Sequence, residues 1–60
     1  MTLYIYKVVR EHMDGSRGKR AKKVYRWKNS LEVGGLYMHL GKGFPGMQRV
    51  LSMETEEFPD

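Results

Sequence analysis

Seven basic side chains fall within residues 15–28, a stretch that contains no acidic residue. They are Arg17, Lys19, Arg20, Lys22, Lys23, Arg26 and Lys28. Like charges this close together repel one another and lower the stability of a compact fold, which is typical of a surface that binds a polyanion. Each phosphate neutralised by such side chains releases counterions, and this gives affinity without sequence readout. The stretch therefore predicts contact with nucleic acid. The alternative is that lysines on an edge strand only keep the protein from aggregating.

Two aromatic rings lie inside the same stretch. Tyr25 and Trp27 alternate with Lys23, so a strand would present all three on one face. Aromatic rings beside cations bind single-stranded nucleic acids by stacking on the bases. We therefore add Tyr25 and Trp27 to the seven basic residues as predicted nucleic-acid contacts. The structural alternative is a cross-strand ladder with Tyr4 and Tyr6, in which each pair contributes about 0.2–1 kcal/mol.

The sequence predicts no enzyme, no cofactor and no metal site. The only histidines, His12 and His39, fall in separate predicted hairpins and lack a metal-ligand spacing. The sequence shows no nucleophilic side chain accompanied by a general base and by a third group that would orient that base. Residues 41–46 form a glycine-rich loop that carries Lys42, but a phosphate-binding loop needs a longer spacing and a following helix. This loop is instead predicted to be a tight hairpin turn, with Phe44 covering one end of the fold.

The elements that position these side chains are predicted to be strands. Residues 3–10 are rich in β-branched and aromatic side chains, which favour a pleated sheet. Residues 22–28 alternate with period two, and the glycines between the two runs predict a hairpin with a long basic tip. A second hairpin joins residues 36–40 to residues 47–53. The four acidic residues of 54–60 are expected to lie in a flexible tail.

Residues 1–53 should form a single domain, because one hairpin alone is marginal in water and two must pack together. We predict an all-β fold, namely a small, partly open antiparallel barrel of four to five strands. The Gly34-Gly35 pair argues against a helix between the hairpins. The core predicted from the alternation comprises Leu3, Ile5, Val9, Val24, Leu31, Val33, Leu36, Met38, Leu40, Val50 and Leu51.

The second half of the chain carries a family resemblance. Residues 31–37, Leu-Glu-Val-Gly-Gly-Leu-Tyr, resemble the segment that leads into a strand of SH3-like barrels. The run 31–51 resembles a short bacterial protein family of uncharacterised function, in which Leu-Gly-x-Gly-x-Pro-Gly at 40–46 precedes Arg-Val-Leu at 49–51. The resemblance implies an SH3-like barrel and no catalytic residue.

The chain has no cysteine, which excludes disulfides and thiolate zinc sites. It has no export signal and no apolar run of the ~18 residues that span a membrane, so we expect a cytoplasmic protein without a membrane partner.

The predicted function is a small basic β-barrel that binds nucleic acid through phosphates and aromatic stacking. The alternative is a protein-interaction module with no nucleic-acid role, acting through a peptide groove, an edge strand or a homodimer. Basic residues gathered on one face would favour nucleic acid, whereas a basic arm wrapped around the domain would favour solubility.

Overall fold

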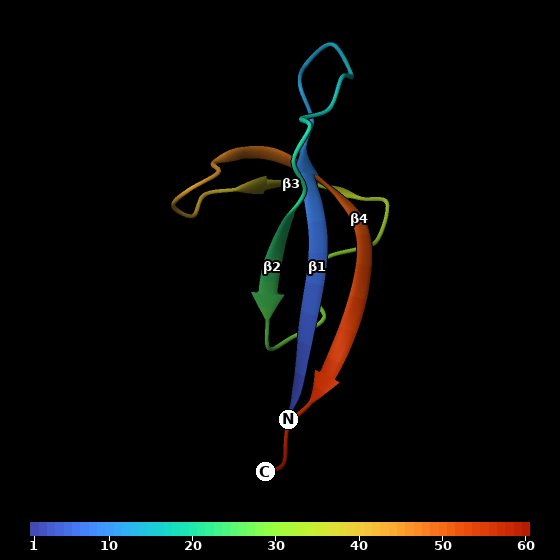
Figure 1. The fold of residues 1–60 in the computed structure, drawn as a ribbon, viewed down its shortest axis with the longest axis vertical. Helices are drawn as coiled ribbons and strands as arrows, with labels where there is room; N and C mark the ends of the chain where they lie inside the picture. Colours follow the sequence, from blue (N-terminus) through green and yellow to red (C-terminus); the bar gives the residue numbers. More distant parts are fainter.

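The computed structural model describes residues 1–60 and contains four strands and no helix. The strands are β1 (Thr2–Arg10), β2 (Lys22–Arg26), β3 (Leu36–His39) and β4 (Gly46–Glu57). They form one antiparallel sheet in the order β2-β1-β4-β3. The sheet curls into a half-barrel, so the all-β, partly open, SH3-like barrel and both predicted hairpins are confirmed (Figure 1). None of the chain forms a helix that could cross a membrane.

The long strand β4 curls the sheet because it pairs with β3 at its start and with β1 over most of its length. The register between β1 and β4 shifts in the middle of β1. Lys7 lies opposite Ser52 and Val8 lies opposite Val50, which leaves Leu51 as the extra residue of a bulge. A bulge bends its strand and increases the local twist. The bent β4 can therefore pair with β3 at its start and with β1 along the rest of its length (Figure 1).

The prediction that the last strand ends at Met53 is wrong. Residues 54–57 continue β4 and pair with residues 2–5 of β1, so this part of the expected tail belongs to the sheet. The acidic side chains are tolerated because they are exposed and the ladder uses only backbone groups. Beyond the strand, the Phe58 N–H donates to the Met1 C=O at 2.8 Å, and the Met1 ammonium lies 2.8 Å from the Asp60 carboxylate. The two ends of the chain therefore lie side by side (Figure 1).

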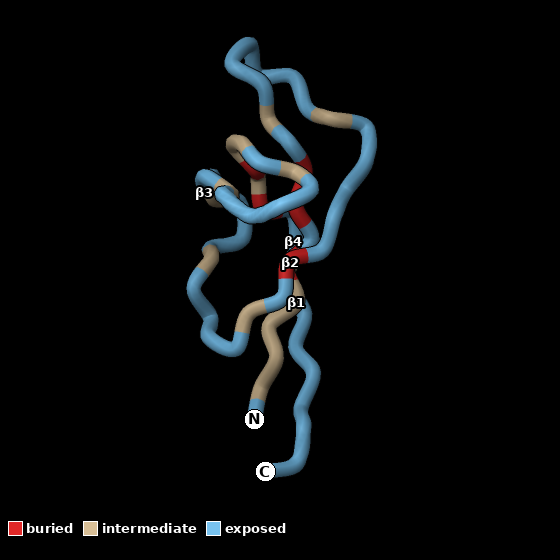
Figure 2. The backbone as a smooth tube through the Cα atoms, turned by 90° about the vertical axis from the view of Figure 1, so that its left-hand side faces the viewer, coloured by how far each residue is buried: buried red, intermediate tan, exposed pale blue.

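The buried core is small and lies midway along the molecule, where β1 passes between its neighbours (Figure 2). Tyr6, Val8, Val24 and Val50 form its central cluster. In the first part of β1 the predicted core face was the wrong one, since Tyr6 and Val8 are buried while Leu3 and Ile5 are only partly covered. The physical reason is that Ile5 shares its face with Lys7, whose ammonium would lose its hydration if that face were buried. At the end of the strand Val9, which lies on the predicted face, is buried as well.

The predicted face of β3 is also inverted. Of the predicted core residues, Val9, Val24 and Val50 are buried, Leu3, Ile5 and Leu31 are partly buried, and Val33, Leu36, Met38, Leu40 and Leu51 are exposed. Tyr37 and His39 turn inward instead. The loop after β3 folds Phe44 onto the His39 ring, and this contact covers the aromatic face of the strand.

Candidate functional site

Four basic side chains line a hollow of about 290 Å³ that lies between the segment leading into β2 and the loop that joins β3 to β4. Arg10 comes from the end of β1, Lys19 and Arg20 from the loop before β2, and Lys22 from the first position of β2. The remaining lining residues are Gly18, Gly43, Phe44 and Gln48. No acidic side chain lines this hollow, so its electrostatic potential favours an anion. We call it the basic hollow.

The wall of the basic hollow is held by a chain of contacts. The Gln48 side chain is only 1 % exposed, and its Nε2 donates to the Phe44 C=O at 3.1 Å. The Phe44 ring stacks on the His39 ring with centroids 4.2 Å apart and an interplanar angle of 11°. The Tyr37 hydroxyl lies 3.1 Å from His39 Nδ1, and burial raises the pKa of this phenol above its ordinary value of 10.0. The Lys22 ammonium lies 5.3 Å from the centroid of the Phe44 ring, within the range of a cation–π contact.

Arg10 is anchored to the loop that precedes β4. Its Nη2 donates to the Pro45 C=O. Gly46 follows with a φ of 122°, a conformation that residues with a Cβ rarely adopt, and its backbone lies against the Arg10 guanidinium. A guanidinium has five N–H donors, so Arg10 retains donors for an anion after this contact.

The structure separates the nine residues that were predicted to bind nucleic acid. Lys19, Arg20 and Lys22 lie together in the basic hollow. Arg17 lies apart from them, with its Nε 3.4 Å from the carboxylate of Glu11. The remaining five residues, which extend along and beyond β2, are Lys23, Tyr25, Arg26, Trp27 and Lys28.

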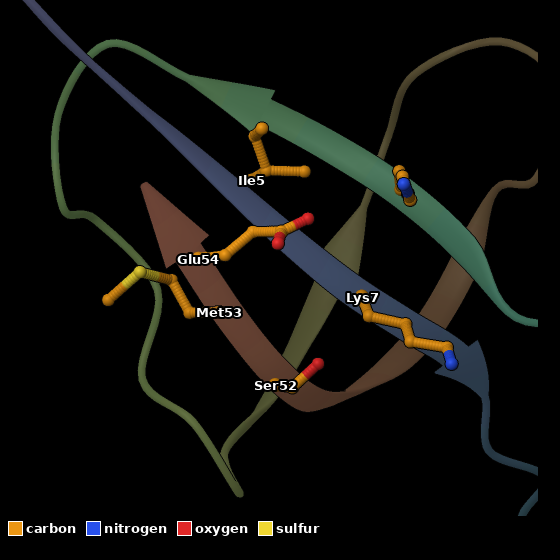
Figure 3. A pocket seen from close by; sticks show the side chains of 6 residues that line it. Ile5, Lys7, Ser52, Met53 and Glu54 are labelled. Atoms are coloured by element: carbon orange, nitrogen blue, oxygen red, sulfur yellow. The ribbon is translucent and has the colours of Figure 1, made fainter. Parts of the chain in front are cut away.

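Lys23 lines a larger hollow of about 450 Å³ on the outer face of the sheet. Lys7 lies directly opposite Lys23 on β1, and like charges in such a cross-strand pair destabilise the sheet. The carboxylate of Glu54 lies in the same hollow and offsets part of this positive charge (Figure 3). The outer hollow therefore carries less net positive charge than the basic hollow, despite its size.

The aromatic residues do not gather on one surface. Tyr25 lies opposite Ile5 on the outer face, whereas Tyr6 is buried on the inner face. The four-ring ladder considered from the sequence is therefore not formed. Trp27 packs edge to face against Phe58, with ring centroids 5.8 Å apart, beside the two chain ends. Figure 1 shows that the chain ends and the loop before β2 lie at opposite ends of the molecule, so Trp27 is remote from the basic hollow.

Among the side chains that line the basic hollow, those of Arg10, Phe44 and Gln48 were not predicted as part of a site. The glycine-rich loop around Phe44 was recognised, but only as a turn. Arg10 lies opposite Gln48 in the β1–β4 pairing, and this pairing joins strands that are distant in the sequence. The residue types and spacing within a single hairpin therefore do not predict that Arg10 and Gln48 lie together.

No group of three or more His, Cys, Asp or Glu side chains is arranged to hold a metal ion. Comparisons with protein-family models, with curated proteins and with solved structures found no match for this chain. The resemblance of residues 31–51 to a bacterial SH3-like family remains a prediction.

Proposed function

We propose that this protein is a small nucleic-acid-binding module whose basic hollow contacts backbone phosphates. The observation that carries the proposal is the convergence of Arg10, Lys19, Arg20 and Lys22 without an acidic side chain among them. Such a cluster repels itself in the free protein, and a bound polyanion relieves that repulsion. The proposed role requires no catalytic residue and no cofactor. We expect the protein to act in the cytoplasm.

Phosphate contact should dominate over base stacking in this hollow. One face of the Phe44 ring is covered by His39, and the Lys22 ammonium approaches the ring as well. Tyr25 and Trp27 are each more than half exposed, but they lie on other parts of the surface. Contacts to phosphates position a protein on nucleic acid without reading its sequence. We therefore expect weak discrimination between sequences.

The test is fluorescence anisotropy of labelled single- and double-stranded DNA and RNA across a salt series. With four phosphates neutralised, the logarithm of the binding constant should fall with the logarithm of salt concentration with a slope of about −3. Replacing one hollow cation, as in Arg20→Gln or Lys22→Gln, should reduce the magnitude of that slope by about one.

Lys28→Gln is the matched control, because it removes the same charge from an exposed residue outside the hollow. It should leave the slope almost unchanged. Equal effects of Lys28→Gln and Lys22→Gln would indicate attraction to net charge alone and would reject the hollow as the site. Absence of binding at low salt, where such contacts are strongest, would reject the proposed function.

The alternative, a protein-interaction module with no nucleic-acid role, is favoured by one observation. The edge strand β3 exposes Leu36 and Met38 and carries no Lys, Arg, Asp or Glu. An exposed apolar edge of this kind can bind another strand.

A further inference from the structure

The chain exposes more surface than a compact protein of its mass. Its accessible surface is 4599 Å², whereas a folded monomer of 7.1 kDa exposes about 4,100 Å². Its radius of gyration is 12.1 Å, against about 10 Å for a compact chain of this length. Only six residues are buried. The surplus of about 500 Å² is surface that a second molecule can cover.

The backbone of β3 has unpaired groups along its outer edge. The Val50 N–H donates to the Gly35 C=O at 2.9 Å, which places the β3–β4 ladder bonds on the odd-numbered residues of β3. The N–H and C=O groups of Leu36 and Met38 therefore point away from β4. No other backbone bond in the chain takes up the N–H of either residue. Both residues are thus ready to pair with another strand.

The side chains of this edge differ in character from those of the opposite edge. Leu36 and Met38 are 43 % and 53 % exposed, and Met38 lies opposite Met47 of β4. By contrast, β2 has the sequence Lys-Lys-Val-Tyr-Arg, with three basic residues among five. Natural sheets use charge, especially lysine, to keep edge strands from pairing. The β2 edge has this protection and the β3 edge lacks it.

We propose that β3 pairs with β3 of a second copy, antiparallel, so that the two sheets join into one. In this arrangement Leu36 lies opposite Met38 of the second copy, and Met38 lies opposite its Leu36. The outward N–H and C=O groups of both residues are then satisfied in both molecules. The same apolar side chains meet on one face, as a two-fold symmetric interface requires.

A second copy fits this edge better than an unrelated partner for two reasons. The edge carries no Lys, Arg, Asp or Glu, so it offers no electrostatic complement to a charged peptide. The same edge of a second copy is equally apolar and can pair with it without bringing charges together. The surplus surface of each chain is also close to the about 600 Å² per partner buried in a small, reversible interface. Mutual repulsion is limited because β2, with its basic residues, lies at the far edge of the sheet. We therefore expect a weak dimer with micromolar to millimolar dissociation.

The dimer has a consequence that rests on the proposed function. The two-fold axis of an antiparallel strand pair is perpendicular to the sheet, so the inner faces of both copies point the same way. Both basic hollows would then face one side of the joined sheet. A single polyanion that spans both hollows binds the second at a high effective concentration, so the dimer should bind long strands more tightly than short ones.

The experiment is sedimentation equilibrium of the full chain over micromolar to millimolar concentrations, combined with NMR of the backbone amides. We expect a monomer–dimer equilibrium, with concentration-dependent shifts centred on the amides of Leu36 and Met38. Met38→Lys places like charges on both sides of the interface and should weaken dimerisation by about tenfold or more. Met38→Pro should have the same effect, since it removes an outward N–H that the monomer does not use.

Met13→Lys is the matched control, because it makes the same substitution at a fully exposed residue in the loop before β2. It should leave the dimer intact. A monomer at every concentration would overturn the proposal, as would a dimer that survives both Met38 variants or whose shifts lie elsewhere. Since no nucleic acid is present, these results are independent of the proposed function. If the protein is a monomer that still binds DNA, only the proposed dimer is refuted. If it is a dimer that binds no nucleic acid, only the proposed function of the basic hollow is refuted.

Discussion

The Arg49 guanidinium binds both carboxylate oxygens of Glu11, with Nη2 2.6 Å from Oε2 and Nε 3.0 Å from Oε1. Such a two-point ion pair is directional as well as strong. Glu11 directly follows β1 and its N–H donates to the Met47 C=O at 3.0 Å, so the pair ties the end of β1 to the first residues of β4. The hydrogen bond from Arg49 lowers the pKa of Glu11 below its ordinary value of 4.5, and Arg17 adds to this effect.

The lowered pKa predicts a defined dependence of stability on pH. A carboxyl group with a lower pKa in the folded state adds stability that is fully present above its unfolded value and is lost as the pH falls through the folded pKa. Glu11→Gln should therefore lower the Tm at neutral pH and have little effect well below pH 4.5. Thermal unfolding followed by circular dichroism measures this difference. Glu32→Gln, which removes an exposed carboxylate without an ion pair, should change the Tm neither at neutral pH nor at acidic pH. A Glu11→Gln effect that is constant with pH would contradict the assignment.

Tyr6 connects the core to the segment between the hairpins. Its hydroxyl donates to Asn29 Oδ1 at 2.7 Å and accepts from the Leu31 N–H at 3.4 Å, and the side chain is fully buried. Tyr6→Phe removes both bonds and should lower the free energy of unfolding by about 1 kcal/mol, measured by urea denaturation. Tyr25→Phe, at an exposed hydroxyl without a hydrogen bond, should stay within about 0.5 kcal/mol of the wild type. Equal losses for the two variants would argue against a structural role for the Tyr6 hydroxyl.

Trp27 provides a way to locate bound nucleic acid. Because Trp27 packs on Phe58 at the end of the molecule away from the basic hollow, phosphate binding in the hollow should leave its fluorescence almost unchanged. Stacking of bases on Trp27, as the sequence predicted, would quench it. The measurement is a fluorescence titration run in parallel with anisotropy of a labelled oligonucleotide. Trp27→Phe should preserve the affinity. Strong quenching together with a loss of affinity in Trp27→Phe would move the site to the other end of the fold.

Gly46 shapes the loop that places Phe44 in the hollow. Its φ of 122° is unfavourable for any residue with a Cβ, so Gly46→Ala should destabilise the fold by about 1–3 kcal/mol in urea denaturation. Gly18→Ala is the matched control. Its φ is not in the positive range, and the added Cβ would meet its nearest atom, Arg10 Cβ, at an ordinary 3.5 Å. This variant should show no loss, and a similar loss at both positions would contradict the role assigned to Gly46.

The local parts of the fold are predictable from the sequence. Period-two alternation and glycine-rich turns located the four strands and both hairpins within a few residues, because these signals act between near neighbours in the chain. The choice of buried face in β3 was not predictable in the same way. Alternation divides Leu36 and Met38 from Tyr37 and His39, but it does not say which pair faces the core. The stacking of Phe44 on His39 decides it, and Phe44 lies beyond the strand.

The candidate site was predicted only in part for a related reason. Lys19, Arg20 and Lys22 are close in sequence, and their density alone identified them. Arg10 and Gln48 join them through the pairing of β1 with β4, whose register depends on a bulge at Leu51 that no local pattern reveals. Conversely, charge density alone grouped Arg17 with these residues, although an ion pair with Glu11 holds it elsewhere.

The central position of the β1–β4 pair also determines the order of events during synthesis. β1 is made before the other three strands, but its main partner, β4, is made after β2 and β3, and the β1–β2 hairpin alone is marginally stable. At about 5–20 residues per second, β1 remains without β4 for a few seconds. During that interval Tyr6 and Val8 are exposed to chaperones and to the nascent strands of neighbouring chains. Because the ladder that buries them joins distant segments, its closure should limit the rate at which the whole domain folds.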